Sequence, residues 1–152
     1  MDQTDRKLIR LLAENADITA TELVPLVNLS IPAINKRIAK LKETGVITRT
    51  VTLTDAKKVG KPVIVFVLIV LGQFSGAQQL LNYVSQEADI LECYAVTGEY
   101  DYLLKICASD IDALERKLLE LKKNKGISKS YTLFTLMQNK FSPVPLPDTE
   151  EQ

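Results

Sequence analysis

The sequence of 152 residues contains no histidine. This absence excludes Ser-His-Asp and Cys-His nucleophile systems, and metal or haem sites with histidine ligands. Cysteine is scarce: Cys93 and Cys107 stand apart in apolar runs, which favours buried free thiols, with a cross-strand disulfide as the alternative. The glycine-rich phosphate-binding patterns GxxxxGK[ST] and GxGxxG are also missing. We therefore expect no catalytic residues of these classes, no metal and no cofactor.

Long hydrophobic segments are missing as well. The longest apolar run, residues 63–71, has nine residues, whereas a helix needs about 20 to cross a bilayer. The opening residues, MDQTDRKLIR, show no secretory signal pattern. We therefore expect a cytoplasmic protein with no membrane partner.

Opposite charges gather in different parts of a chain whose formal net charge is zero. Residues 36–61 contain eight Lys and Arg against two acids, a net charge of +6, whereas residues 62–152 carry −4. A basic block beside an acidic remainder suggests two functions, one of them next to a polyanion. Unless a motif supports binding to a polyanion, the simpler interpretation is that the basic residues form a run of solvated charges.

Three helices are predicted in the first 45 residues. An apolar stripe at helical spacing runs through TDRKLIRLLAEN, residues 4–15. The second helix begins at the capping box of residues 19–22, and we expect Pro25 to shorten or distort it. The third, SIPAINKRIAKLKETG, begins at Ser30 and ends at Gly45, with one apolar face and one basic face.

The second and third helices together predict a helix-turn-helix, in which the later helix enters the major groove of DNA. A plain three-helix packing unit is the alternative. The alternating segment VITRTVTLT, residues 46–54, predicts a strand or small wing. Asn35 suits an adenine edge and Lys36 a guanine, and the longer basic side chains suit phosphates. The predicted DNA contacts are Ser30, Pro32, Ala33, Asn35, Lys36, Arg37, Lys40 and Arg49.

The rest of the chain has a different periodicity. Its predicted strands and helices follow the order βαββαβ, a ferredoxin-like split unit with both helices on one face of a four-stranded sheet. The run VIVFVLIVL is apolar on both of its faces, so the second face of the sheet also needs a cover. We therefore expect an obligate dimer formed through this sheet.

The predicted fold class is α+β, with four parts. Residues 1–50 form a winged helix-turn-helix domain, and residues 51–62 form a linker strand or hinge. Residues 63–141 form a ferredoxin-like domain for ligand binding and dimerisation. Residues 142–152, with three prolines and three acids, form an extended or disordered tail.

Three segments together resemble the Lrp/AsnC family of transcription regulators. DQTDRKLIRLLAENADIT resembles the opening helix of the family, LSIPAINKRIAKLKETGVI its recognition helix, and VTGEYDYLL its effector-domain signature. The chain departs from the family at Pro25 and at Asn28, where glycine is usual. The resemblance implies DNA binding rather than catalysis, and dimers that assemble into tetramers or octamers.

The resemblance also implies that the turn TGEYDY, residues 97–102, adjoins a cleft between neighbouring dimers, which binds an amino acid or a similar small molecule. Gly98 either lets a ligand approach backbone amides or merely makes the turn. Asp101 either receives an α-ammonium group or holds turn amides. The predicted effector contacts are Thr97, Gly98, Glu99, Tyr100 and Asp101, with Thr132 and Phe134 of the last strand opposite them.

Motifs and resemblance together predict a sequence-specific transcriptional regulator, associated with the nucleoid, that binds double-stranded DNA at a near-palindromic operator and responds to an amino acid. Two alternatives remain open. A ligand-sensing or assembly module that has lost DNA function would be consistent with Pro25 inside the second helix. A haem-precursor decarboxylase on the same scaffold is disfavoured, because those reactions depend on histidine.

Overall fold

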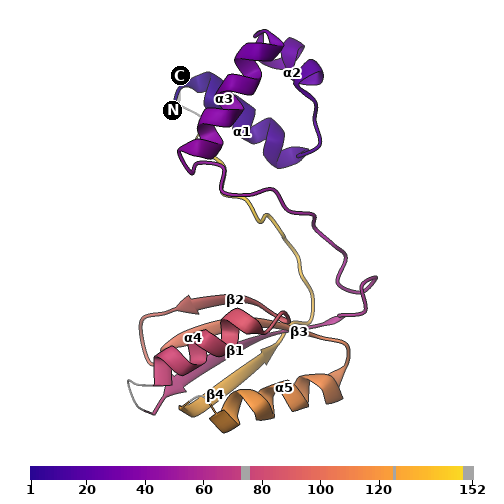
Figure 1. Cartoon of the computed structure of the whole chain (residues 1–152). Helices are drawn as coiled ribbons and strands as arrows, with labels where there is room; N and C mark the ends of the chain where they lie inside the picture. Colours follow the sequence, from indigo (N-terminus) through magenta and orange to yellow (C-terminus); the bar gives the residue numbers. More distant parts are fainter. Residues whose placement is uncertain (73–75, 125, 149–152) are drawn as a thin grey trace. The chain divides into compact units, whose positions relative to one another are not determined.

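The computed structural model describes residues 1–72, 76–124 and 126–148, and the chain forms two compact units (Figure 1). The helical unit contains Met1–Leu53 together with the chain from Lys140 onward, and the sheet unit contains Thr54–Asn139. The C-terminal segment thus belongs with the N-terminal helices, although the sequence suggested a tail of its own from residue 142.

The helical unit begins with α1 (Gln3–Glu14), which starts at a reciprocal cap. The Asp2 carboxylate accepts a hydrogen bond from the Asp5 amide at 2.8 Å, and the Asp5 carboxylate accepts one from the Asp2 amide at 3.2 Å. Both amides would otherwise lack partners at the helix start. Further along the helix, Leu8 is fully buried in a core with Leu23 and Ile34.

The second helix, α2 (Ala20–Val27), is short and tolerates a proline. Thr19 and Glu22 form the predicted capping box, with the Thr19 amide 2.7 Å from the Glu22 carboxylate. The helix continues for two residues beyond Pro25, which is exposed. Asn28 then ends it with φ of 54°, a left-handed conformation that asparagine adopts more readily than most residues.

The third helix, α3 (Ile31–Glu43), packs on the others through its buried residues Ile34 and Leu41. Ser30 precedes it with extended backbone, but its side chain makes no capping hydrogen bond. Residues 44–62 contain neither helix nor strand, so the strand predicted there was wrong for the described chain. Its alternating apolar residues Val51 and Leu53 are exposed and have no strand to pair with in this single copy.

The sheet unit confirms the predicted βαββαβ order. Its elements are β1 (Val63–Leu71), α4 (Gly76–Gln86), β2 (Ile90–Ala95), β3 (Tyr102–Ala108), α5 (Ile111–Asn124) and β4 (Ile127–Phe134). The strands lie in the order β2-β3-β1-β4, with antiparallel neighbours throughout, and both helices cover the same face (Figure 1). None of the helices in the described ranges combines the length and hydrophobicity that a membrane crossing requires.

Alternate residues of β1 make the core of this unit. Val65, Val67 and Ile69 are fully buried and pack with Leu80 of α4 and Leu114 of α5. Because side chains alternate along a strand, the residues between them face away from both helices. β1 is therefore apolar on a second face that α4 and α5 do not cover.

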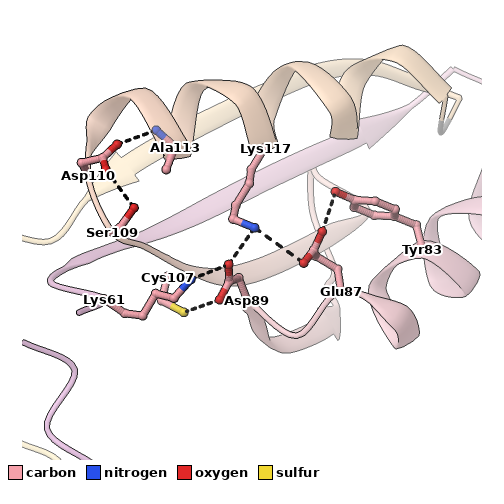
Figure 2. Close-up of polar contacts among 9 residues, drawn as sticks. All are labelled: Lys61, Tyr83, Glu87, Asp89, Cys107, Ser109, Asp110, Ala113 and Lys117. Atoms are coloured by element: carbon pink, nitrogen blue, oxygen red, sulfur yellow. Dashed lines mark hydrogen bonds and ion pairs between the residues drawn. The ribbon is translucent and has the colours of Figure 1, made fainter. Parts of the chain in front are cut away.

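A polar cluster centred on Asp89 joins three parts of the sheet unit (Figure 2). The Asp89 carboxylate is 2.7 Å from Lys117 Nζ of α5 and 2.9 Å from Lys61 Nζ, just before β1. These hydrogen bonds, with that of Lys117 the stronger cause, lower the pKa of Asp89 to about 2. Lys117 also lies 3.6 Å from the Glu87 carboxylate, so acidic and basic groups balance within the cluster.

Cys93 and Cys107 are both free, as we expected in preference to a disulfide. Burial raises the pKa of each thiol, and the nearby Asp89 carboxylate raises that of Cys107 further. Because the thiolate is the reactive form, the raised pKa makes both side chains poor nucleophiles.

We predict that Asp89→Asn destabilises the chain at neutral pH by about 1 kcal/mol, since its partly solvated ion pairs are lost. The folded pKa of about 2 lies below the ordinary 3.8, so the carboxylate stabilises the fold above about pH 4. That contribution disappears as the pH falls through 2. Urea unfolding of wild type and variant should therefore differ at pH 7 and converge in acid.

The matched control is Glu115→Gln, which removes an exposed carboxylate from the middle of α5, outside the cluster and away from the helix ends. It should follow the wild-type stability curve from pH 7 into acid. If the free energy of unfolding differed between wild type and Asp89→Asn by a constant amount down to pH 2, the ion-pair origin of the effect would be contradicted.

Candidate DNA-binding surface and effector pocket

The outward surface of α3 carries most of the predicted DNA contacts. Ile34 and Leu41 hold the helix against the core, which turns the opposite side chains toward solvent. Ala33 is half-buried between the two sides. The predicted contacts that are exposed are Ser30, Pro32, Asn35, Lys36 and Lys40. This surface has hydrogen-bonding and positively charged groups on a rigid helix, as major-groove recognition requires.

Arg37 differs from its neighbours because it pairs within the unit. Its guanidinium is 2.6 Å from the Asp2 carboxylate and 2.8 Å from the Asp5 carboxylate, so it ties α3 to the start of α1. The bond to Asp2, then that to Asp5, raises the pKa of Arg37. The Asp5 amide, then the Arg37 guanidinium, lowers the pKa of Asp2. We assign Arg37 the role of a brace, although the sequence suggested DNA contact.

Arg49, the remaining predicted DNA contact, lies beyond α3. It is exposed in the segment that lacks regular structure, residues 44–62. Its phosphate contact was predicted from a strand or small wing; the described chain forms no strand there, and the phosphate contact stays a prediction. No capping or strand hydrogen bond fixes its direction here.

The turn between β2 and β3 is tied to the end of β1 by Asp101. The Val96 amide donates to the Asp101 carbonyl at 3.0 Å, which closes the turn. The Asp101 amide donates to the Ile69 carbonyl at 2.8 Å, and the Asp101 carboxylate accepts from the Leu71 amide at 2.7 Å. The Asp101 carboxylate therefore holds a backbone amide, as one of its two predicted roles required, but the amide belongs to the end of β1 and not to the turn.

Gly98 lies at the tip of this turn with φ of 108°. No heavy atom lies within 4 Å of the position that a Cβ would take, so the backbone conformation and not the space calls for glycine. Thr97 and Glu99 beside it are exposed, and Tyr100 is half-buried. The conformation of the turn is enough to explain why residue 98 is glycine. The exposed Gly98 amide also remains accessible to a ligand.

An open pocket of about 340 Å³ lies beside the turn, within the usual range for small ligands. Of the predicted effector residues, all within the described ranges, only Asp101 lines it. Its walls come from the ends of β1, β2 and β3 and from the start of α4. The lining residues are Leu71, Gly72, Ala77, Ala95, Val96, Asp101 and Tyr102.

The structure does not bring Thr132 and Phe134 to this pocket. β4 runs antiparallel to β1, so Phe134 pairs with Val65 and Thr132 with Val67, away from the end of β1 at Leu71. Thr132 also faces the helices, because it shares the side of its buried partner. Within one chain, these two residues cannot form the wall opposite the turn that we predicted.

The sequence analysis missed the small apolar residues of the pocket. Nothing in their types marks Gly72, Ala77 or Ala95 as ligand contacts. The strand order could have found some of them, because a ferredoxin-like sheet pairs β1 with β3 antiparallel and so brings the end of β1 to the start of β3. Among the described side chains, no group of three or more Cys, Asp and Glu is placed to hold a metal ion.

Comparison with known proteins assigns both units. Residues 1–48 match the winged helix-turn-helix DNA-binding family, and residues 63–145 match the Lrp/AsnC ligand binding domain. The glutamate uptake regulatory protein of Zymomonas mobilis subsp. mobilis is 32% identical over 155 residues, which cover 100% of this chain and 94% of that protein. The matched families and relatives are transcriptional regulators and not enzymes.

Two crystal structures show the same fold. An AsnC family transcriptional regulator from Agrobacterium tumefaciens has a TM-score of 0.89 and 32% identity, covering 96% of this chain and 97% of that one. A transcriptional regulator from Neisseria meningitidis in complex with L-Met has a TM-score of 0.91 and 27% identity, with the same coverage. The chain therefore belongs to the Lrp/AsnC family of transcriptional regulators, with an N-terminal helix-turn-helix DNA-binding domain and a C-terminal Lrp/AsnC ligand-binding domain.

Proposed function

We propose that this regulator reads a near-palindromic operator as a dimer or a larger assembly, and that an amino acid bound in the sheet unit changes its activity. The observation that carries the proposal is the outward surface of α3. There Asn35, Lys36 and Lys40 are exposed on a helix whose opposite side is buried. We also propose that the protein is cytoplasmic and associates with the nucleoid, because its function requires contact with DNA.

In the proposed complex, α3 lies in the major groove. Asn35 hydrogen-bonds an adenine edge and Lys36 a guanine, whereas Lys40 and Arg49 contact phosphates. Ser30, Pro32 and Ala33, at the helix start, pack close to the base edges and the sugar-phosphate backbone. Arg37 keeps α3 in position through Asp2 and Asp5. Two copies set their helices roughly one or two DNA turns apart, which explains a near-palindrome.

In the proposed effector complex, the ligand occupies the pocket beside the turn. Asp101 is the charged side chain among the described lining residues, and it attracts the α-ammonium group of an amino acid. The accessible Gly98 amide suits the α-carboxylate, while Thr97, Glu99 and Tyr100 flank the opening. The L-Met complex of the Neisseria meningitidis relative supports this ligand class. Thr132 and Phe134 contribute only if another copy supplies them.

The second face of the sheet supports pairing between copies. Phe66 and Leu68 of β1 lie opposite Leu133 and Tyr131 of β4, so all four side chains share the face that the helices leave uncovered. Tyr131 is 52% exposed and Leu133 is 43% exposed. A second copy of the same face removes this apolar surface from water, and two such dimers or four assemble into a tetramer or octamer.

The first prediction from the proposed function compares two adjacent residues of α3. Lys36→Gln should weaken binding to a duplex selected by the wild type from random DNA roughly tenfold or more, because one base contact contributes about 1–3 kcal/mol. Its melting temperature should not change. Arg37→Gln should instead lower the melting temperature, since Asp2 and Asp5 lose their cationic partner. Gel retardation and calorimetry of both variants measure the two effects.

The two variants each remove one positive charge from the same helix, so each serves as the control for the other. Wild-type affinity in Lys36→Gln would contradict α3 as the reading helix. Full stability in Arg37→Gln would contradict the bracing role.

The second prediction concerns the pocket. A thermal-shift screen of the twenty amino acids at millimolar concentration should find at least one that raises the melting temperature by several degrees. A ligand present at 100 times its Kd stabilises the native state by about 2.7 kcal/mol. Ala95→Leu, which fills the pocket, should abolish the shift. A flat screen, or a shift that survives Ala95→Leu, would contradict this pocket as the site.

The third prediction concerns pairing. The wild-type protein should sediment as a dimer or larger particle at micromolar concentration, and Leu133→Glu should dissociate it, because a charge on the uncovered face cannot be buried. The matched control is Leu119→Glu, an equally exposed leucine of α5 on the helix side, which should keep at least the dimer. A folded wild-type monomer at micromolar concentration would overturn the pairing.

A further inference from the structure

The C-terminal segment, residues 141–148, contributes to the helical unit in a way that the proposed function does not explain. The 86 residues Thr54–Asn139 form the sheet unit, and the chain then returns to the helices of its own N-terminus. There Arg6 donates a hydrogen bond to the Asp148 carbonyl at 2.9 Å, and Arg10 donates one to the Pro147 carbonyl at 2.5 Å. Both ends of the chain thus build one unit.

The two arginines are suited to hold an extended peptide. They are one helical turn apart, at positions i and i+4, so they share one side of α1. Leu8 and Leu11 take the other side into the core. Arg6 and Arg10 are half-buried, and the planar guanidinium group of each offers several N–H donors to backbone carbonyls. Their two bonds reach successive carbonyls, which fixes the register of the segment on the helix.

The segment is itself suited to docking. Its sequence, FSPVPLPD, places a proline at every second position, residues 143, 145 and 147. Proline restricts φ and favours an extended backbone whose carbonyls are not used within a helix or sheet. Less conformational entropy is then lost when the segment binds. Pro147, whose carbonyl Arg10 binds, is half-buried, while Val144 and Leu146 remain largely exposed.

We infer that residues 141–148 are a docking peptide for α1 and that the side of α1 with Arg6 and Arg10 is its seat. The segment is covalently joined to the sheet unit at residues 139–140, so its docking on α1 adds a noncovalent tether to the covalent connection between the two units at residues 53–54. Release of the segment leaves only the covalent connection. The seat therefore controls how freely the DNA-binding helices can reorient on the rest of the chain, whichever DNA or effector the regulator binds.

Trypsin tests this docking on the full chain, because Lys140 stands where the segment enters the helical unit. Cleavage after Lys140 releases the fragment of residues 141–152, which mass spectrometry quantifies directly. Removal of both guanidinium donors in Arg6→Gln/Arg10→Gln should raise the cleavage rate roughly tenfold, since proteolysis follows the population of the released state. The matched control, Lys122→Gln/Lys123→Gln, loses the same charge from exposed positions of α5 and should cleave at the wild-type rate.

A second measurement keeps the inference testable if the double variant folds poorly. Amide hydrogen exchange of α1 should be faster in a chain that ends at Lys140, while α4 and α5 should not change. Adding the peptide of residues 141–152 should restore slow exchange, and a scrambled peptide should not. Equal cleavage rates, or unchanged exchange after truncation, would overturn the docking. If cleavage of the wild-type protein becomes faster on dilution, the segment docks on another copy. That result would overturn the proposed tether within one chain.

Discussion

The apolar character of β1 on both of its faces is the constraint on which the sheet unit depends. Val65, Val67 and Ile69 are shielded by α4 and α5, which explains why both helices lie on one side. Phe66 and Leu68 lie on the face that the helices leave uncovered, so only one face of β1 is buried in a single chain. The free energy of burying this apolar surface grows with its area, which is the reason for our proposal that a second copy covers it.

Ion pairs within the helical unit determine which of its basic residues remain available to contact DNA. Arg37 and Lys36 are neighbours on α3 with the same charge, yet Arg37 meets two carboxylates and Lys36 faces solvent. A positive charge that already has partners within the fold loses those contacts if it turns to a phosphate. The capping acids of α1 thus help to position the reading helix from a place distant in sequence, while they also cap their own helix.

Much of the fold could be predicted from local patterns. The capping box at Thr19, the left-handed Asn28 and the βαββαβ order depend on short-range chemistry that one sequence displays. The role of Arg37 could not be predicted in this way, because its partners Asp2 and Asp5 lie more than 30 residues away. The pocket was hidden for a similar reason: its walls are small residues at strand ends, brought together by strand register and not by a motif.

Asp101 gives the sheet unit a mechanical link between its ligand pocket and its central strand. Its carboxylate accepts from the Leu71 amide at the end of β1, and it also lines the pocket. An ammonium group that takes up this carboxylate competes with that amide for the same oxygen atoms. Occupation of the pocket would then act directly on the last residues of β1, and the same strand carries Phe66 and Leu68 on the face that α4 and α5 leave uncovered. If copies pair through this face, as we propose, a bound small molecule changes the contact between subunits without approaching the DNA.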